Sequence, residues 1–158
     1  MTDHIAARPH AAASMHAALG VLRANGLRIS TARRLVLEAL FASELPVSAD
    51  MIAGGLGGRL PASDLASVYR NLETLEAVGL VRHLHLGHGA SRYVLTGRGD
   101  HGWATCQACG RHERLERDQA AQLRAAVRGT TGFEARFSHF PIVGLCRDCA
   151  VAGELVPA

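Results

Sequence analysis

The stretch that decides the fold runs Leu65-Ala-Ser-Val-Tyr-Arg-Asn-Leu-Glu-Thr-Leu75. Its apolar residues recur at spacings of three and four, which predicts a helix with one buried stripe. The stripe consists of Leu65, Val68, Leu72 and Leu75. Pro61 and Ser63 are expected to open this helix and Gly79 to end it. The polar residues off the stripe are Ser67, Tyr69, Arg70, Asn71 and Thr74, and they suit either a DNA-reading face or an ordinary solvated one.

Three shorter helices are predicted upstream of this one. The first covers residues 14–25 and ends at Gly26, where a left-handed stop is expected. The second begins at Ser30 or Thr31, either of which can cap a helix. The third begins after Ser48 and should be short or frayed, because glycine disfavours helix. Its glycines are Gly54, Gly55, Gly57 and Gly58.

A hairpin is predicted downstream of the decisive helix. Residues 80–86 and 91–96 have strand composition, and Gly87-His88-Gly89-Ala90 lies between them as a turn. Short helices followed by a hairpin form the winged helix-turn-helix order, in which the last helix enters the major groove and the hairpin meets the adjacent backbone. We therefore predict a winged-helix domain over residues 14–97.

Composition narrows the class of protein. The chain has 158 residues, of which 48% are hydrophobic, and a net charge of +3. All 17 basic residues are arginine, which favours phosphate and guanine contacts, although GC-rich coding bias gives the same enrichment. No apolar run approaches a membrane span, and the start lacks the pattern of a secretory signal. We expect a cytoplasmic protein with a disordered tail over residues 1–13.

The strongest chemical signal is Cys106-Gln-Ala-Cys109 paired with Cys146-Arg-Asp-Cys149. Two such knuckles complete tetrahedral thiolate coordination, which suits zinc and leaves no open position, so the site should be structural. A zinc-ribbon thiol switch is an alternative, whereas disulfides are unusual in a cytosolic chain. No nucleophile with a base is evident, so we expect neither an enzyme nor a small organic substrate.

A second domain is predicted beyond a hinge at residues 98–100. All four cysteines lie in it, at residues 101–158, together with strands over 111–116, 133–137 and 141–145 and a helix over 119–127. Its apolar strand residues need covering, which favours a homodimer. The expected fold class is α+β, with an N-terminal winged helix followed by a small α/β dimerisation domain that holds structural zinc.

Several stretches together resemble the ferric uptake regulator family. They are Leu22-Arg-Ala-Asn-Gly-Leu-Arg28, Thr31-Ala-Arg33, Leu65 to Leu72, Glu76-Ala-Val-Gly-Leu-Val81, Cys106-Gln-Ala-Cys-Gly110, Gly132-Phe133 and Gly144-Leu-Cys-Arg-Asp-Cys149. The resemblance implies a homodimer that binds a palindromic operator, with Tyr69 and Arg70 touching DNA and Arg28 reaching the minor groove. The predicted DNA-binding residues are Arg28, Arg33, Ser67, Tyr69, Arg70 and Asn71.

The resemblance also implies a second, exchangeable metal site. The positions of its usual ligands read Pro46, Val94 or its neighbours, and His101-Gly-Trp103, so His101 alone matches. The chain offers other ligands, and the candidate regulatory set is His83, His85, His88, Asp100, His101 and His139. Imidazoles on one strand face suit a divalent metal, with Zn²⁺ favoured over Fe²⁺, Ni²⁺ or Mn²⁺. Incidental histidines on a solvated wing, or a hydrogen-bonded cluster at the hinge, are the alternatives.

These patterns predict a metal-dependent transcriptional repressor of metal-ion homeostasis genes. In this hypothesis, metal held by hinge and wing residues couples domain orientation to operator binding. A peroxide-sensing regulator of the same family, in which iron bound near Asp100 and His101 promotes oxidation of its own ligand, is the alternative.

Overall fold

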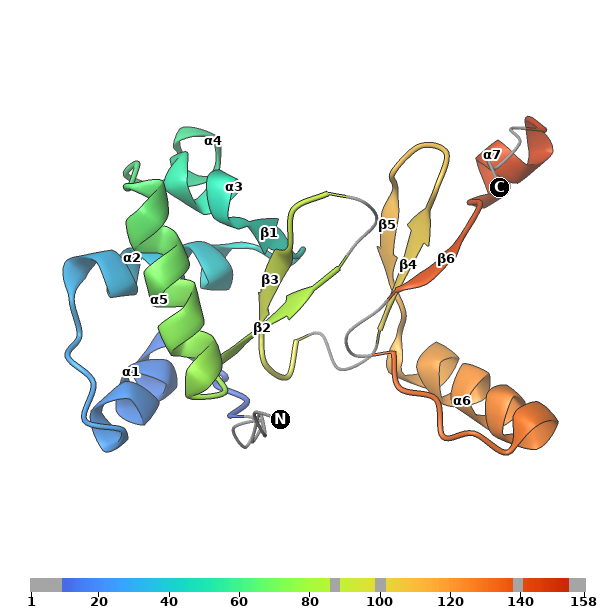
Figure 1. Cartoon of the computed structure of the whole chain (residues 1–158), viewed down its shortest axis with the longest axis horizontal. Coiled ribbons are helices and arrows are strands. Elements are labelled where there is room, and N and C mark those ends of the chain that lie inside the picture. The colour runs from blue at the N-terminus through green and yellow to red at the C-terminus, as the bar shows by residue number, and fades with distance from the viewer. Residues whose placement is uncertain (1–9, 86–88, 99–101, 138–140, 154–158) are drawn as a thin grey trace, which may run out of the picture. The chain divides into compact units, whose positions relative to one another are not determined.

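The computed structural model describes residues 10–85, 89–98, 102–137 and 141–153 (Figure 1). The chain divides into two compact units. The first consists of Met1–His83 with Ser91–Arg98, and the second consists of Leu84–Ala90 with the chain from Gly99 onward. Each unit is described by itself below.

The first unit is built around helices. They are α1 (Met15–Ala24), α2 (Thr31–Ala42), α3 (Ala49–Ala53), α4 (Gly55–Gly58) and α5 (Leu65–Ala77). Four of them begin at a side chain that accepts a hydrogen bond from a backbone N–H of the first turn, which satisfies one otherwise unpaired donor. These caps are Ser14, Ser30, Ser48 and Asp64. Asp64, rather than Pro61 or Ser63, therefore begins α5.

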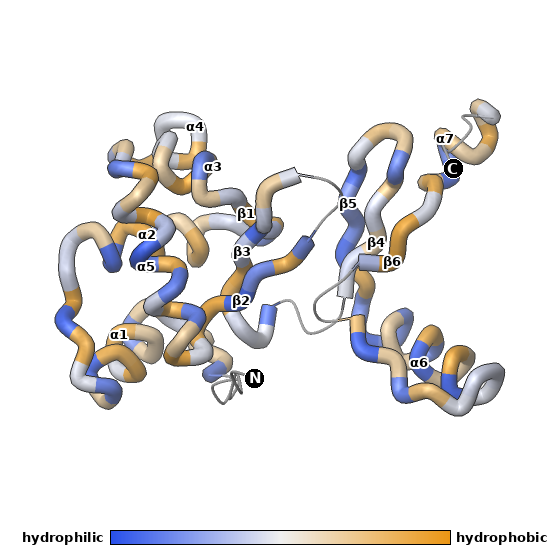
Figure 2. Tube along the Cα trace, in the orientation of Figure 1, coloured by the Kyte–Doolittle hydropathy of each residue, from blue (hydrophilic) through white to orange (hydrophobic). Residues whose placement is uncertain are grey.

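The core of this unit confirms most of the predicted stripe. Val68, Leu72 and Leu75 of α5 are almost fully buried and pack with buried residues of α2 and α3. Leu65, the first residue of α5, is 39% exposed, because it lies at the end of the helix beyond the packed turns. Figure 2 shows hydrophobic and hydrophilic residues alternating along these helices, as expected where one face is buried.

A small sheet completes the first unit. It has the order β1-β3-β2, with β1 at Val47–Ser48, β2 at Val81–Leu84 and β3 at Arg92–Leu95. The predicted hairpin strands are present but shorter than the expected ranges 80–86 and 91–96. The strand β1 was not predicted from sequence, since two residues are too few to show an alternating pattern. It pairs antiparallel with β3, with Val47 opposite Tyr93.

The second unit combines a three-stranded sheet with two helices. Its sheet has the order β5-β4-β6, formed by β4 (Trp103–Cys106), β5 (His112–Arg114) and β6 (Ile142–Gly144). β5 is antiparallel to β4, whereas β6 is parallel to it. The helix α6 (Arg117–Thr131) follows β5, and α7 (Arg147–Val151) follows β6 at the opposite end of the sheet (Figure 1). The fold class is thus α+β, as predicted.

Two local predictions for the second unit were wrong. Residues 133–137 do not form a strand. They pass Gly102 closely, where an added Cβ would lie 2.6 Å from the Cβ of Phe137. Phe137 therefore packs at Gly102 rather than pairing in a sheet, whereas Phe133 is exposed. The helix α6 is longer than the predicted 119–127, because a capping box of Glu116 and Gln119 starts it earlier and a left-handed Gly132 ends it.

The predicted disordered tail is also too long at its C-terminal end. The backbone N–H of His10 donates to the carbonyl of Gly79 at 3.0 Å, and Ala12 packs against the core of the first unit. Residues 1–9 lie outside the described part of the chain. Among the described helices, none has the length and apolar character needed to cross a membrane.

The turn between α3 and α4 generates a stability prediction. Gly55 has φ +67°, and a Cβ added there would lie 2.0 Å from the carbonyl oxygen of Leu60. We expect Gly55→Ala to lower the free energy of unfolding by more than about 2 kcal/mol, because it adds left-handed strain to a backbone clash. Urea denaturation measures this loss.

The matched control is Gly20→Ala. Gly20 is exposed within α1, and its added Cβ would meet nothing within 4 Å. This variant should gain about 1 kcal/mol, because alanine is the better helix former. Equal effects of the two substitutions would contradict the described turn.

Candidate metal centre and nucleic-acid interface

Four cysteines converge at one end of the second sheet. Their sulfur atoms all lie within 4.8 Å of one another, and the Sγ atoms of Cys109 and Cys146 are 3.8 Å apart. Tetrahedral zinc with Zn–S bonds of about 2.3 Å separates its sulfurs by about 3.8 Å. All four cysteines are free of disulfides. Their number, spacing and chemistry fit a closed zinc site, as predicted for Cys106, Cys109, Cys146 and Cys149.

Secondary structure brings the two knuckles together. Cys106 ends β4, and the parallel pairing of β4 with β6 places Cys106 opposite Gly144. Cys146 then caps α7, and Cys149 lies within that helix. The turn after Cys106 closes through the N–H of Gly110, which donates to the Cys106 carbonyl at 3.0 Å. Gly110 has φ +72°, a left-handed conformation that favours glycine.

Backbone amides prepare the centre for negative charge. The backbone N–H of Cys109, followed by that of Cys146, lowers the pKa of the Cys106 thiol to about 6. The N–H of Cys146 lies 3.3 Å from the Cys106 sulfur. At Cys109 the N–H of Arg111 acts to lower the pKa, but the shared hydrogen bond with Cys106 and desolvation together raise it. A divalent cation would favour the deprotonated form of all four cysteines, because its charge stabilises every thiolate at once.

The polar face of α5 presents two of the predicted DNA contacts to solvent. Tyr69 is 38% exposed, and the side chain of Arg70 is 71% exposed. The nearest acid recorded for Arg70 is Asp64, at 4.0 Å, and such an exposed pair holds the guanidinium only weakly. Arg28, which precedes α2, is also exposed. These three side chains are available to a phosphate or a base edge.

The other three predicted DNA contacts are less accessible. Ser67 and Arg33 are half-buried, and Asn71 is only 8% exposed. Asn71 was expected to lie off the buried stripe of α5, and the structure corrects this. Its side chain is turned inward, where its Oδ1 accepts a hydrogen bond from Nε of Arg33 at 3.2 Å. Its position signals this burial, because residue 71 lies three after Val68 and four before Leu75 on the helix, although asparagine as a residue type is usually exposed.

The structure describes two of the six candidate regulatory ligands, His83 and His85. His83 lies in β2 and is half-buried, with its Nδ1 2.6 Å from Oε1 of Glu76. His85 is exposed and lies just past the end of β2. His83 and His85 therefore do not share one face of this strand, because β2 ends at Leu84. The remaining candidates are outside the described residues, namely His88, Asp100, His101 and His139. Within the described residues, the four cysteines are the one recorded group able to hold a metal.

Three positions where the family resemblance places metal ligands carry apolar side chains. Pro46 is buried, Val94 is 5% exposed and Trp103 is 1% exposed. Proline and valine offer no ligand atom, and the indole N–H of tryptophan donates hydrogen bonds only. Pro46, Val94 and Trp103 themselves therefore offer no ligand atom to the exchangeable site that the resemblance implies.

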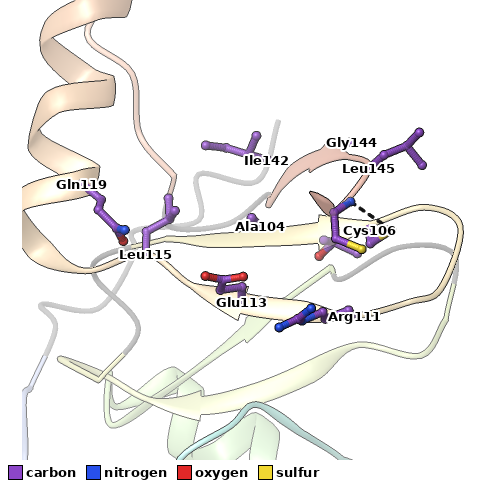
Figure 3. Close-up of a pocket in the computed structure, with 11 residues that line it drawn as sticks. Ala104, Cys106, Arg111, Glu113, Leu115, Gln119, Ile142, Gly144 and Leu145 are labelled. Atoms are coloured by element: carbon purple, nitrogen blue, oxygen red, sulfur yellow. Dashed lines mark hydrogen bonds between the residues drawn. The ribbon is translucent and has the colours of Figure 1, made fainter. Parts of the chain in front are cut away.

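A pocket of about 310 Å³ also lies in the second unit (Figure 3). Glu113 and Arg111 border it along β5, and Leu115 and Gln119 border it beside α6. The Cys106 thiol in its wall already belongs to the cysteine cluster. The Cys146 thiol in the same wall also belongs to that cluster, so the pocket shares both of its thiols with the candidate zinc site.

The helical bundle with a β-hairpin, followed by an α/β unit, defines a winged-helix DNA-binding protein. Its four clustered thiols can hold a metal ion. The sequence pattern of the ferric uptake regulator family matches residues 24–140. The chain therefore belongs to the ferric uptake regulator family. It is a transcription regulator and not an enzyme.

Individual relatives agree with this assignment. The chain is 34% identical over 143 residues to the peroxide operon regulator of Bacillus subtilis, covering 89% of this chain and 96% of the relative. It is 30% identical over 128 residues to the peroxide-responsive repressor PerR of Staphylococcus saprophyticus, covering 81% of this chain and 86% of the relative.

Solved structures support the same fold. The Vibrio cholerae ferric uptake regulator has a TM-score of 0.62 at 25% identity, over 80% of this chain and 98% of that one. The Helicobacter pylori ferric uptake regulator has a TM-score of 0.67 at 20% identity, over 87% of this chain and 94% of that one. The latter likeness concerns the fold alone.

The cysteine cluster generates a metal prediction. We expect one tightly held zinc per chain in the purified protein, measured by elemental analysis, and its loss in Cys149→Ser, because three thiolates cannot close the site. The variant should also unfold at lower temperature, since metal binding contributes to folding. Gln107→Ala, in the exposed stretch between two of the cysteines, is the control and should keep its zinc. Full zinc content in Cys149→Ser would contradict the site.

Proposed function

We propose that this protein is a homodimeric repressor that binds a palindromic operator and responds to a second, regulatory metal ion. The observation that carries the DNA-binding part is the outward face of α5, where Tyr69 and Arg70 are exposed while the opposite stripe is buried. A helix held in this way can enter the major groove, and arginine is well suited to guanine. Binding to operator DNA implies a cytoplasmic location.

The homodimer is supported by apolar side chains that the second unit leaves uncovered. Large examples are Leu123, Phe133, Val143 and Val151, of which Phe133 is 76% exposed. Exposed apolar groups of this size mark an association surface, and a second copy of the chain is the partner we propose. A two-fold dimer presents two recognition helices, which matches a palindromic site with two half-sites.

For the regulatory metal we propose ligands from His83, His85, His88, Asp100, His101 and His139. The contact between His83 and Glu76 supports part of this set. Metal-bound histidines usually donate their second ring N–H to a carboxylate, and Nδ1 of His83 has such a partner at 2.6 Å. Its Nε2 is the nitrogen we propose as a ligand. Zinc is the favoured ion because the set is rich in nitrogen, and iron, nickel and manganese are the alternatives.

Peroxide sensing is the second candidate function. Both curated relatives described above are named as peroxide regulators, and the chain covers most of their length. The chemistry would require a redox-active ion such as iron, with Asp100 and His101 as the proposed ligands. Because the candidate set mixes carboxylate and imidazole, it suits iron as well as zinc.

Operator binding is tested with Arg70→Ala. Removing this guanidinium should weaken operator binding about 5- to 150-fold and relax base preference at one position of each half-site, as expected for loss of a base contact. Arg128→Ala is the control of equal charge, because Arg128 lies on α6 and pairs with Glu134. Fluorescence anisotropy at fixed salt separates the two variants, and equal losses would mean that general charge alone drives binding.

The signal is tested by measuring operator affinity with zinc, iron or no added metal, before and after peroxide. We expect zinc to raise the affinity of the wild type and the double substitution His85→Ala with His101→Ala to remove that response. His16→Ala, an exposed histidine of α1, should respond as the wild type does. An iron-dependent response lost on peroxide treatment, with added oxygen on a histidine detected by mass spectrometry, would instead establish peroxide sensing. An unchanged metal response in the double variant would show that the ligand set is wrong.

A further inference from the structure

We propose that Asn71 and Arg33 act together as positioning residues that set the place of Arg28 on the DNA-binding face. They were predicted from sequence as direct contacts with DNA. Their described hydrogen bonds instead join the recognition helix α5 to the start of α2 and to the backbone of residue 28. The inference rests on the proposed operator binding and adds to it the residues that hold one contact in place.

The side chain of Asn71 is fully engaged within the protein. Its Oδ1 accepts from Nε of Arg33 at 3.2 Å, and its Nδ2 donates to the carbonyl of Ser67 at 2.8 Å. Donor and acceptor ends thus each have a matching partner, and rotation of the amide by 180° would set its oxygen against that carbonyl. With 8% of its surface exposed, Asn71 is a buried anchor rather than a base reader.

Arg33 links Asn71 to the backbone of Arg28. Its Nε is held by Asn71, while its NH1 donates to the backbone carbonyl of Arg28. The backbone N–H of Arg33 also donates to Oγ of Ser30 at 3.2 Å, which caps α2. Two directions of the guanidinium fork are therefore used to hold the segment from residue 28 to residue 30 against the helix. The exposed side chain of Arg28 projects from the segment that this fork fixes.

The bridge depends on the geometry of the arginine side chain. A planar guanidinium donates along fixed directions from Nε and from its terminal nitrogens, so it can bridge two acceptors at once. A lysine ammonium is a single point charge on a flexible stem, and it cannot reproduce that bridge. Both acceptors, the Asn71 amide and the Arg28 carbonyl, are neutral groups. Arg33→Lys therefore separates the bridge from the charge.

The decisive experiment is a double-substitution cycle on operator affinity with Arg28→Ala, Asn71→Ala and the combination. If Asn71 acts through Arg28, each single change should weaken binding about tenfold, and the combination should be little weaker than Arg28→Ala alone. Arg33→Lys should lose affinity to a similar degree, although it keeps the positive charge. Thr74→Ala is the control, because it removes another hydrogen bond of α5, from Oγ1 of Thr74 to the carbonyl of Arg70. Its effect should add to that of Arg28→Ala.

Independent losses for Asn71→Ala and Arg28→Ala would overturn the proposal, as would wild-type affinity in Arg33→Lys. A further decrease of about one in the salt slope when Arg33→Ala is added to Arg28→Ala would instead identify a direct phosphate contact of Arg33. Hydrogen exchange supplies a readout without DNA, and amides of residues 27–30 should exchange faster in Asn71→Ala while those of α1 do not. If the wild type binds no operator, the proposed function fails, and the exchange data still decide whether the bridge holds this segment.

Discussion

Burial of the apolar stripe of α5 is the constraint on which the rest of the DNA-binding unit depends. Val68, Leu72 and Leu75 lose nearly all contact with water, and burying side chains of this size contributes about 1.5–3 kcal/mol each. The same packing fixes the rotation of the helix about its axis. Tyr69 and Arg70 are then turned outward, while Asn71 is turned inward toward Arg33. The DNA-binding face is thus a consequence of core packing.

Helical periodicity made much of this unit predictable, because a stripe with spacings of three and four has one geometric solution. The cysteine pairs were equally informative, since two knuckles with four thiols suit one kind of centre. Sequence was less informative where tertiary contacts decide. The residue type of Asn71 indicated exposure, although its helical position lies on the buried stripe. The apolar residues at 133–137 imitate a strand, although Phe137 packs near Gly102 and Phe133 is exposed. The short β1 likewise exists only because β3 pairs with it.

The structure and the family membership together limit which residues can hold a regulatory metal. The cysteine cluster has the distances and amide donors of a closed zinc site, and such a site stabilises the fold without exchanging its ion. Val94 and Trp103 place buried apolar groups where the family resemblance expects ligands. A regulatory metal, if it follows our proposal, must use a different set, for which the carboxylate-bonded His83 is the described starting point.

The central claim is that this chain reads a specific operator as a metal-responsive dimer. The most direct measurement is selection of bound duplexes from a random pool at fixed salt, with and without added zinc. Our account predicts enrichment of one palindromic motif in the presence of zinc and little enrichment in its absence. Binding that stays weak, salt-dependent and without sequence preference under every metal condition would contradict the account.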